Sequence, residues 1–263
     1  MNNDFSLEDL IPKPYQDTCP IHGMTEFRAG RCGKCQEVKI KEEQHQKYLN
    51  ELNTKIANAG LVGRLARATF DNAIALSDED EKQISLMKRY AENFRVKAKP
   101  QNISLILSGA VGTGKTHLAC AVAHELLANT QEWVKYTRIA EMIDCVKSGW
   151  DNKIGTNESI QKFVQYDLLI IDEIGVSTGS EFEHQILTRI MDDRYIHEKP
   201  SILITNLDSR GAQEWLGERV FSRLIEGMVD DKGVVKNFIK FKGKDKRKSY
   251  KIEAKKQGGM GDV

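Results

Sequence analysis

The second half of the chain alternates short apolar runs with longer amphipathic stretches. Four apolar runs predict buried strands, at residues 103–107, 133–137, 166–171 and 201–205. Three amphipathic stretches between them predict helices, at residues 117–127, 139–149 and 180–198. Residues 168–171 read Leu-Leu-Ile-Ile, which is typical of a parallel strand that is covered on both faces. This alternation predicts an α/β fold with a doubly wound parallel sheet flanked by helices.

The first third of the chain is more polar. Ser77 and the three acidic residues after it predict the start of an amphipathic helix over residues 77–96. Residues 36–59 carry only a thin apolar stripe and predict a solvated helix or a helical linker, with a partner-binding helix as the alternative. We therefore expect a small N-terminal adaptor over residues 1–60. A larger domain over residues 61–263 would end in a last strand near residues 234–241 and a basic tail.

The composition narrows the class of protein. A net charge of +1 does not suggest a strongly basic nucleic-acid binder, although it does not exclude a local basic patch. No apolar stretch approaches the roughly 18 residues that span a bilayer, and the first twenty residues lack the apolar segment of a signal peptide. We therefore expect a cytoplasmic protein with no membrane partner. Three of the five cysteines cluster, which favours a metal site over a disulfide scaffold, and we expect Cys120 and Cys145 to be buried in helices.

A phosphate-loop pattern lies between a predicted strand and a predicted helix. Residues 108–116 read Ser-Gly-Ala-Val-Gly-Thr-Gly-Lys-Thr, which contains G-x-x-x-x-G-K-[ST]. In such a loop Lys115 reaches the β- and γ-phosphates and the Thr116 hydroxyl binds Mg²⁺. The predicted ATP contacts are Gly109, Ala110, Val111, Gly112, Thr113, Gly114, Lys115, Thr116 and His117. A glycine-rich turn that binds nothing is the alternative, and the strand–helix context argues against it.

Two further predicted strands end in polar residues that would complete this site. Asp172 and Glu173 follow residues 168–171, where Asp172 would hold Mg²⁺ and Glu173 would polarise the attacking water. Asn206 follows the strand at residues 201–205, and its amide can both donate and accept hydrogen bonds to orient that water. The alternatives are an ordinary acidic turn and a capping asparagine.

Two arginines and a basic chain end are further candidates for function. Arg219 and Arg223 are four positions apart and would share one face of a helix. Either guanidinium could act on the γ-phosphate of a neighbouring subunit, and solvated surface arginines are the alternative. Residues 232–256 are rich in lysine and could contact a nucleic-acid backbone or form a disordered tail.

The clustered cysteines form a metal-ligand pattern with one histidine. Cys19 and His22 make a C-x-x-H pair, and Cys32 and Cys35 make a C-x-x-C pair nine residues later. A Cys₃His set suits tetrahedral Zn²⁺, and because four protein ligands leave no position for water, the metal would be structural. A segment this short has no hydrophobic core of its own, and we therefore expect metal binding to drive its folding. Chance cysteines in a loop are the alternative.

Together these motifs resemble the DnaC-like family of bacterial and phage helicase loaders, which is close to the IstB-like transposition helper ATPases. The resemblance covers roughly residues 61–247 and is most specific at residues 172–175 and 216–223. It implies an AAA+ P-loop ATPase core with a minimal or absent lid domain. The implied roles are Walker A for residues 109–116, Walker B for Asp172 and Glu173, sensor 1 for Asn206, arginine finger for Arg223 or else Arg219, and sensor 2 for Arg247.

The resemblance also implies a function and partners. Members of the family use ATP to place a hexameric replicative helicase (DnaB-like) on single-stranded DNA, and they associate into an ATP-dependent spiral. Their N-terminal domain binds the helicase, so residues 1–60 would be the adaptor. The implied cofactors are ATP, Mg²⁺ and structural Zn²⁺, with ATP hydrolysis that is slow and stimulated by DNA or a partner. A transposition helper that binds duplex DNA and a transposase is the alternative, and a nucleotide switch without turnover is a third reading, which the presence of Glu173 disfavours.

Overall fold

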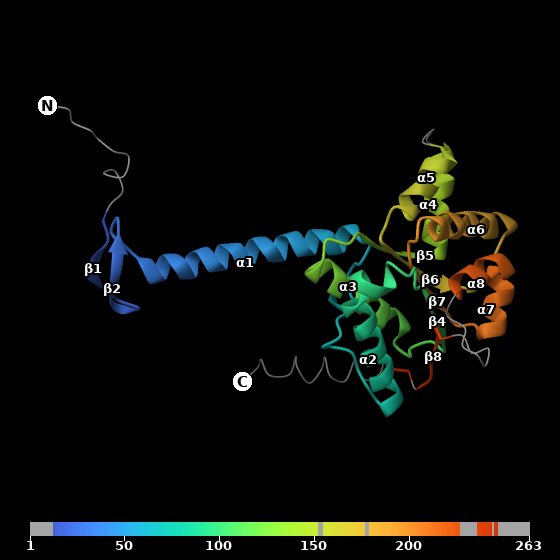
Figure 1. Cartoon of the computed structure of the whole chain (residues 1–263), viewed down its shortest axis with the longest axis horizontal. Coiled ribbons are helices and arrows are strands. Elements are labelled where there is room, and N and C mark those ends of the chain that lie inside the picture. Colours follow the sequence, from blue (N-terminus) through green and yellow to red (C-terminus); the bar gives the residue numbers. More distant parts are fainter. Residues whose placement is uncertain (1–12, 152–154, 177–178, 227–235, 244, 247–263) are drawn as a thin grey trace, which may run out of the picture. The chain divides into compact units, whose positions relative to one another are not determined.

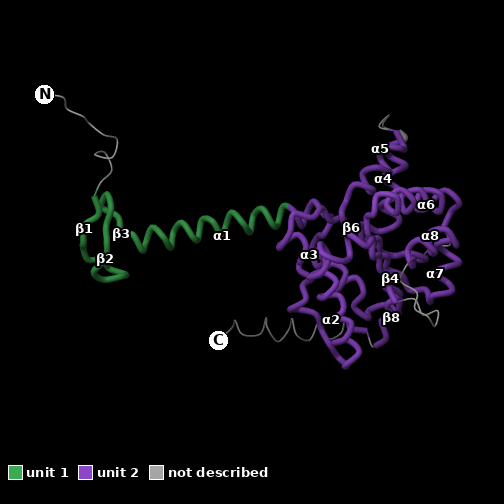
Figure 2. Tube along the Cα trace, viewed as in Figure 1, with its two compact units in different colours: residues 1–54 green, residues 55–263 purple. Residues whose placement is uncertain are grey.

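The computed structural model describes residues 13–151, 155–176, 179–226, 236–243 and 245–246. The chain divides into two compact units, Met1–Thr54 and Lys55–Val263 (Figure 2). Among the helices in the described ranges, none combines the length and the apolar character that a bilayer crossing requires.

The first unit holds a small antiparallel sheet and most of one long helix. Its strands are β1 (Tyr15–Cys19), β2 (Gly23–Arg28) and β3 (Arg31–Cys32), paired in that order. Helix α1 (Gly33–Asn58) starts directly after β3 and is seen in Figure 1 as a single long rod. Ile56 is its one buried residue, which agrees with the expectation of a largely solvated helix.

The second unit is built on a parallel sheet, which has five strands within the described part of the chain (Figure 1). The strands are β4 (Leu105–Gly109), β5 (Val134–Arg138), β6 (Leu168–Ile174), β7 (Ser201–Thr205) and β8 (Phe238–Phe241). Their order is β5-β6-β7-β4-β8, and every neighbouring pair is parallel. The predicted α/β fold with a parallel sheet is therefore confirmed.

Helices cover both faces of this sheet, which explains why its central strands β4, β6 and β7 are mainly apolar and buried. They are α2 (Asp78–Glu92), α3 (Lys115–Asn129), α4 (Ile139–Asp151), α5 (Thr156–Val164), α6 (Glu181–Ile196), α7 (Ser209–Leu216) and α8 (Glu218–Leu224). Leu169 and Ile171 belong to a core that contains buried residues of α4 to α8. The alternate residues Leu168 and Ile170 point to the opposite face, where α3 crosses the strands.

Helix α2 starts where the sequence predicts and ends earlier. Ser77 is its N-cap, since the Ser77 hydroxyl accepts a hydrogen bond from the Asp80 N–H (3.3 Å). The regular helix stops at Glu92, and the next residues, Phe94–Ala98, form the π-helical turn η3.

One helix was not predicted, and one expectation about a helical residue is wrong. The unpredicted helix is α5, a short helix whose buried residues lie on one face. Cys145 is exposed, so the expectation that it is buried is wrong, whereas Cys120 is buried as expected. The buried residues near Cys145 are Met142, Ile143 and Val146, and Cys145 lies on α4 beside the face that they form. The expectation of a minimal or absent lid domain stays a prediction, because residues 247–263 lie outside the described residues.

Candidate nucleotide site and metal centre

The predicted phosphate loop joins the end of β4 to the start of α3. Gly114 precedes the helix with φ of 98°, a left-handed conformation that favours glycine, and α3 begins at Lys115. Gly109 has φ of 148°, and a Cβ there would lie 2.2 Å from the carbonyl oxygen of Phe241. The two glycines therefore let the backbone turn tightly between the strand and the helix. The loop and the first N–H groups of α3 form the kind of cradle that binds phosphate.

Lys115 is held inside this loop by oxygen acceptors. Its Nζ donates to the carbonyl oxygens of Gly109 (2.6 Å) and Ala110 (2.8 Å) and to the side-chain oxygen of Asn206 (3.1 Å). The Thr113 hydroxyl also donates to Ala110 (2.8 Å), which closes the turn. The structure thus brings the loop lysine and the predicted water-orienting amide into direct contact.

Asp172 receives hydrogen bonds on both of its carboxylate oxygens. The Thr116 hydroxyl (2.8 Å) and the Tyr136 hydroxyl (3.0 Å) both donate to Oδ2, and the Glu173 N–H donates to Oδ1 (2.7 Å). Carboxylate and hydroxyl oxygens are the ligands that Mg²⁺ takes in proteins, so Thr116 and Asp172 fit this cation. Tyr136 belongs to no motif, and the sequence gives no signal for its part in the site.

Glu173 adopts an unusual backbone conformation at the end of β6. Its φ is 63°, a left-handed value that is uncommon outside glycine and is often found at functional sites. The pairing of β6 with β7 shifts register between Ile171 and Ile174, which frees Glu173 from regular pairing. Its carboxylate, about half exposed, lies 3.5 Å from Arg138 Nε. The chain is therefore bent so that Glu173 reaches the mouth of the site.

The predicted site residues converge on one cavity of about 550 Å³. Its lining includes Lys115, Thr116, Asp172, Glu173 and Asn206, which come from α3, β6 and the residue after β7. These are the groups that a P-loop enzyme uses for phosphate, metal and water. The structure therefore places together residues that lie up to about ninety positions apart in the sequence.

A wall of the cavity comes from the segment before α2. Val62, Arg64 and Leu65 line it, although the sequence shows no periodic pattern there. His117 Nε2 lies 2.9 Å from the Thr69 carbonyl oxygen, which ties this segment to α3. Burial lowers the pKa of His117, so the ring is neutral near pH 7 and Nε2–H donates to that carbonyl. A partly apolar wall beside a phosphate loop suits the base of a nucleotide.

Lys246 lines the cavity from the far end of the chain. Its N–H donates to the Gly112 carbonyl (2.9 Å), and its Nζ lies 2.6 Å from the carboxylate of Asp80. Both side chains are buried, and although burial opposes it, the ion pair lowers the pKa of Asp80. Lys246 therefore packs against the phosphate loop and joins it to α2 through Asp80. Arg247, the predicted sensor 2 residue, lies outside the described residues.

The two candidate finger arginines lie away from this cavity. Both project from α8 to Asp192 of α6, with Arg219 Nη2 2.6 Å from that carboxylate and Arg223 also paired with it. The Arg223 guanidinium lies over the Tyr195 ring, 5.1 Å from its centroid. Neither arginine is among the described residues that line the cavity of its own chain.

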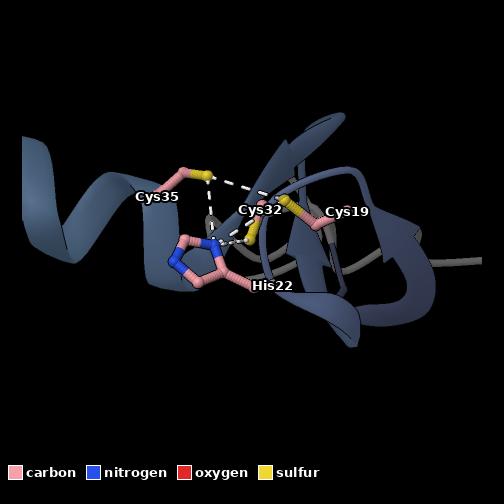
Figure 3. Close-up of side chains that lie close together, drawn as sticks. All are labelled: Cys19, His22, Cys32 and Cys35. Carbon is pink, nitrogen blue, oxygen red and sulfur yellow. Dashed lines mark hydrogen bonds between the residues drawn. The ribbon is translucent and has the colours of Figure 1, made fainter.

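The four predicted metal ligands come together in the first unit (Figure 3). Cys19 ends β1, His22 follows in the turn, Cys32 lies in β3 and Cys35 lies in the first turn of α1. Their ligand atoms all lie within 4.8 Å of one another. Cys19 Sγ is 3.6 Å from Cys35 Sγ, and His22 Nδ1 is 3.4 Å from Cys35 Sγ and 3.7 Å from the other two sulfurs.

These distances fit a tetrahedral metal. Zn–S bonds of about 2.3 Å at tetrahedral angles give S···S edges of about 3.8 Å, close to the observed separations. The backbone N–H groups of Ile21 and His22 lower the pKa of the Cys19 thiol to about 6, which favours the thiolate that metals bind. Hydrogen bonding to Cys19 raises the pKa of Cys35 to about 11. The cluster therefore has the ligand atoms and the spacing of a zinc site, and the lowered pKa of Cys19 favours its thiolate form.

The order of the strands defines the class of protein. Strand β7, which leads into Asn206, lies between β4 with its phosphate loop and β6 with Asp172. A strand placed between the phosphate-loop strand and the acidic strand, in a parallel sheet with helices on both faces, is the arrangement of AAA+ P-loop domains. The fold and the site therefore define an ATP-binding protein of the AAA+ class.

Comparison with known proteins gives the family. The family model described as IstB-like ATP binding protein matches residues 36–254, and the chain belongs to this family. The replicative helicase loader DnaC of Buchnera aphidicola subsp. Acyrthosiphon pisum (strain APS) is 33% identical over 172 residues, which cover 64% of this chain and 68% of the relative. DnaC of Escherichia coli (strain K12) is 35% identical over 159 residues, which cover 59% of this chain and 62% of the relative.

A solved structure shares the fold. The crystal structure of the DnaC helicase loader superposes with a TM-score of 0.58 at 20% identity, over 69% of this chain and 100% of the solved chain. The predicted resemblance to DnaC-like AAA+ proteins is therefore confirmed.

Proposed function

We propose that this chain is an ATP-dependent loader that places a hexameric replicative helicase on single-stranded DNA. The observation that carries the proposal is the 33% identity over 172 residues to a replicative helicase loader. The cavity supplies the means, because the groups that P-loop enzymes use for phosphate, metal and water converge in it.

In the proposed reaction each group of the cavity has one task. Lys115 leaves the loop carbonyls for phosphate oxygens, because a charge-assisted bond to phosphate is stronger than one to a neutral carbonyl. Thr116 and Asp172 would hold Mg²⁺, which would neutralise phosphate charge. Glu173 accepts the proton of the attacking water, and Asn206 orients that water.

We further propose that the active form contains several copies of the chain. Arg223, or else Arg219, would approach the γ-phosphate held by the next copy, since neither reaches the cavity of its own chain. This arrangement makes ATP a link between subunits, and it predicts that hydrolysis is slow in the isolated chain.

The first unit is the proposed adaptor and holds one structural Zn²⁺. Close to the metal ligands, Ile21 and Met24 are 79% and 70% exposed, although both are apolar. Exposed apolar side chains on a rigid metal-held hairpin suit contact with a protein partner better than contact with DNA, which is read by basic groups.

The test is co-elution of the full chain with its cognate hexameric helicase in the presence of Mg²⁺ and a slowly hydrolysed ATP analogue. Met24→Glu should weaken the complex at least about tenfold, because it places a charge in the proposed contact. Val96→Glu is the matched control, since Val96 is also apolar and 70% exposed but lies in the second unit. Failure of the wild-type chain to bind the helicase would overturn the proposal.

The second candidate function is a transposition helper, which the IstB-like family model favours. The same preparations separate the two functions when single-stranded and duplex DNA are offered with ATP. Tight ATP-dependent binding to duplex DNA, together with no binding to the helicase, would decide for the transposition helper.

A further inference from the structure

A tyrosine outside every motif lies behind the metal-binding carboxylate. Tyr136 in β5 is buried, and its hydroxyl donates to Asp172 Oδ2 (3.0 Å), the same oxygen that accepts from Thr116. The other carboxylate oxygen is held by the Glu173 N–H. The orientation of the Asp172 carboxylate therefore depends on two hydroxyl groups and one backbone amide.

The direction of this contact follows from its chemistry. A carboxylate oxygen accepts hydrogen bonds, so the Tyr136 hydroxyl is the donor to Oδ2. The Thr116 hydroxyl would also be a Mg²⁺ ligand, so Tyr136 is the hydroxyl donor to Asp172 that has no part in holding the metal.

The backbone of Tyr136 is fixed by the residues that follow α1. Strand β5 lies at the edge of the sheet, and the Tyr136 N–H donates outward to the Ala59 carbonyl (2.7 Å). A Cβ at Gly60 would lie 2.6 Å from the Tyr136 carbonyl oxygen, so Gly60 packs directly on this peptide. Lys135 Nζ adds a bond to the Asn58 carbonyl (3.2 Å). Strand β5 therefore contacts the residues at the end of α1 and, through the Tyr136 hydroxyl, the carboxylate of Asp172.

We propose that Tyr136 is a positioning residue for the Mg²⁺-binding carboxylate of Asp172, and that residues 59–60 set its position. The inference rests on the proposed ATP function. Metal ligands are commonly oriented by partners outside the metal's own coordination sphere, and loss of such a partner typically costs about 10–100-fold in metal affinity. A movement at the end of α1 would therefore change the affinity of the nucleotide site for Mg²⁺.

The first test removes only the hydroxyl. Binding of a fluorescent ATP analogue is measured over a range of Mg²⁺ concentrations and also in EDTA. For Tyr136→Phe we expect the Mg²⁺ concentration at half-maximal binding to rise about tenfold, with affinity in EDTA unchanged. Tyr90→Phe is the matched control, because the Tyr90 hydroxyl also donates a bond (2.8 Å), but to the Ile103 carbonyl away from the cavity.

Three outcomes of this test have different meanings. A wild-type Mg²⁺ requirement in Tyr136→Phe overturns the inference. An equal loss of affinity in Mg²⁺ and in EDTA also overturns it, because that pattern belongs to a general disturbance of the fold. A wild-type chain that binds no nucleotide under either condition overturns the proposed ATP function itself.

The second test addresses residues 59–60 with a pair of glycines. Gly60 and Gly63 both have positive φ, 82° and 57°, but a Cβ at Gly63 meets nothing within 4 Å. Gly60→Ala should raise the Mg²⁺ requirement in the same direction as Tyr136→Phe, whereas Gly63→Ala should not. Equal effects of the two substitutions overturn the role of residues 59–60.

If the Gly60→Ala protein does not fold, a milder substitution provides the test. Lys135→Met removes the Nζ bond to Asn58 and leaves the peptide groups of β5 in place. We expect the Mg²⁺ requirement to rise about threefold, the scale of one lost hydrogen bond. A requirement equal to that of the wild-type chain in Lys135→Met then overturns the role of this segment.

Discussion

Arg194 of α6 is completely buried and holds together the loops that enter β6 and β7. Its Nη1 donates to three carbonyl oxygens around the end of α5, those of Phe163 (2.9 Å), Val164 (3.2 Å) and Tyr166 (2.9 Å). Its other two nitrogens donate to the Pro200 carbonyl (2.6 Å) and the Ser201 hydroxyl (2.9 Å). Arg194 thus caps α5, whose last carbonyls have no partner within the helix. It also fixes the entry of the two strands that lead to Asp172 and Asn206.

We expect Arg194→Met to destabilise the second unit by about 3 kcal/mol. Four carbonyl oxygens lose a hydrogen bond from Arg194, at about 1 kcal/mol each, the typical net value of one hydrogen bond. Removal of the buried charge acts in the opposite direction and stabilises the variant. Burial lowers the pKa of Arg194 to about 9, which shows that the buried charge is unfavourable, and methionine carries none. The lost bonds should outweigh that relief, since breaking buried charged networks usually costs about 3–5 kcal/mol.

Urea denaturation followed by circular dichroism measures the effect. With a slope of about 3 kcal/mol per molar urea, the midpoint should fall by about 1 M, and Arg194→Lys should lie between the two. Arg210→Met is the control, because Arg210 is exposed and pairs with Glu214 on α7 (2.9 Å), so a change below about 0.5 kcal/mol is expected. A wild-type midpoint in Arg194→Met would refute the reasoning, because relief of the buried charge would then equal the lost bonds.

Three other expected results concern the nucleotide site and the metal cluster. Lys115→Ala should abolish binding of a fluorescent ATP analogue while circular dichroism stays unchanged, and normal binding would remove the basis for the phosphate loop. Glu173→Gln should keep ATP binding but lower turnover by about 100-fold or more in a phosphate-release assay, and unchanged turnover would favour the nucleotide switch. Elemental analysis should find one zinc per chain, and chelation should unfold the hairpin of the first unit without changing the melting of the second. Metal-free purified protein would contradict the zinc assignment.

Sequence alone predicts those parts of the site that one segment encodes. The phosphate loop and the acidic pair Asp172–Glu173 each combine a local motif with a flanking apolar strand. Asn206 could be found because it follows a strand whose apolar run is continuous, and carboxyl ends of parallel strands meet at one edge of a sheet. The metal ligands were also predictable, since their spacing is a local property.

The rest of the site depends on packing that no local pattern encodes. Tyr136 faces Asp172 because β5 pairs with β6, a consequence of strand order rather than of any motif. Val62 and Leu65 line the cavity because an aperiodic segment passes over the phosphate loop. Cys145 was predicted wrongly because a helical pattern locates the apolar face only approximately. A cysteine at the edge of that face can be either buried or exposed.

The pairing at Asp192 bears on which arginine acts on a neighbouring subunit. The side chain of Arg219 is 67% exposed and that of Arg223 is 25% exposed, yet both bind the same carboxylate. If Arg223 moved to a neighbouring phosphate, it would give up this ion pair and its contact with the Tyr195 ring. Arg219 would still neutralise Asp192, so no buried carboxylate would be left without a cation. If Arg219 acted instead, Arg223 would stay in place and nothing in α6 would need to change. The shared pairing therefore lets either arginine act without leaving Asp192 unpaired, and Arg219, which is more exposed and would leave the Arg223 contact with the Tyr195 ring in place, would move at the lower cost.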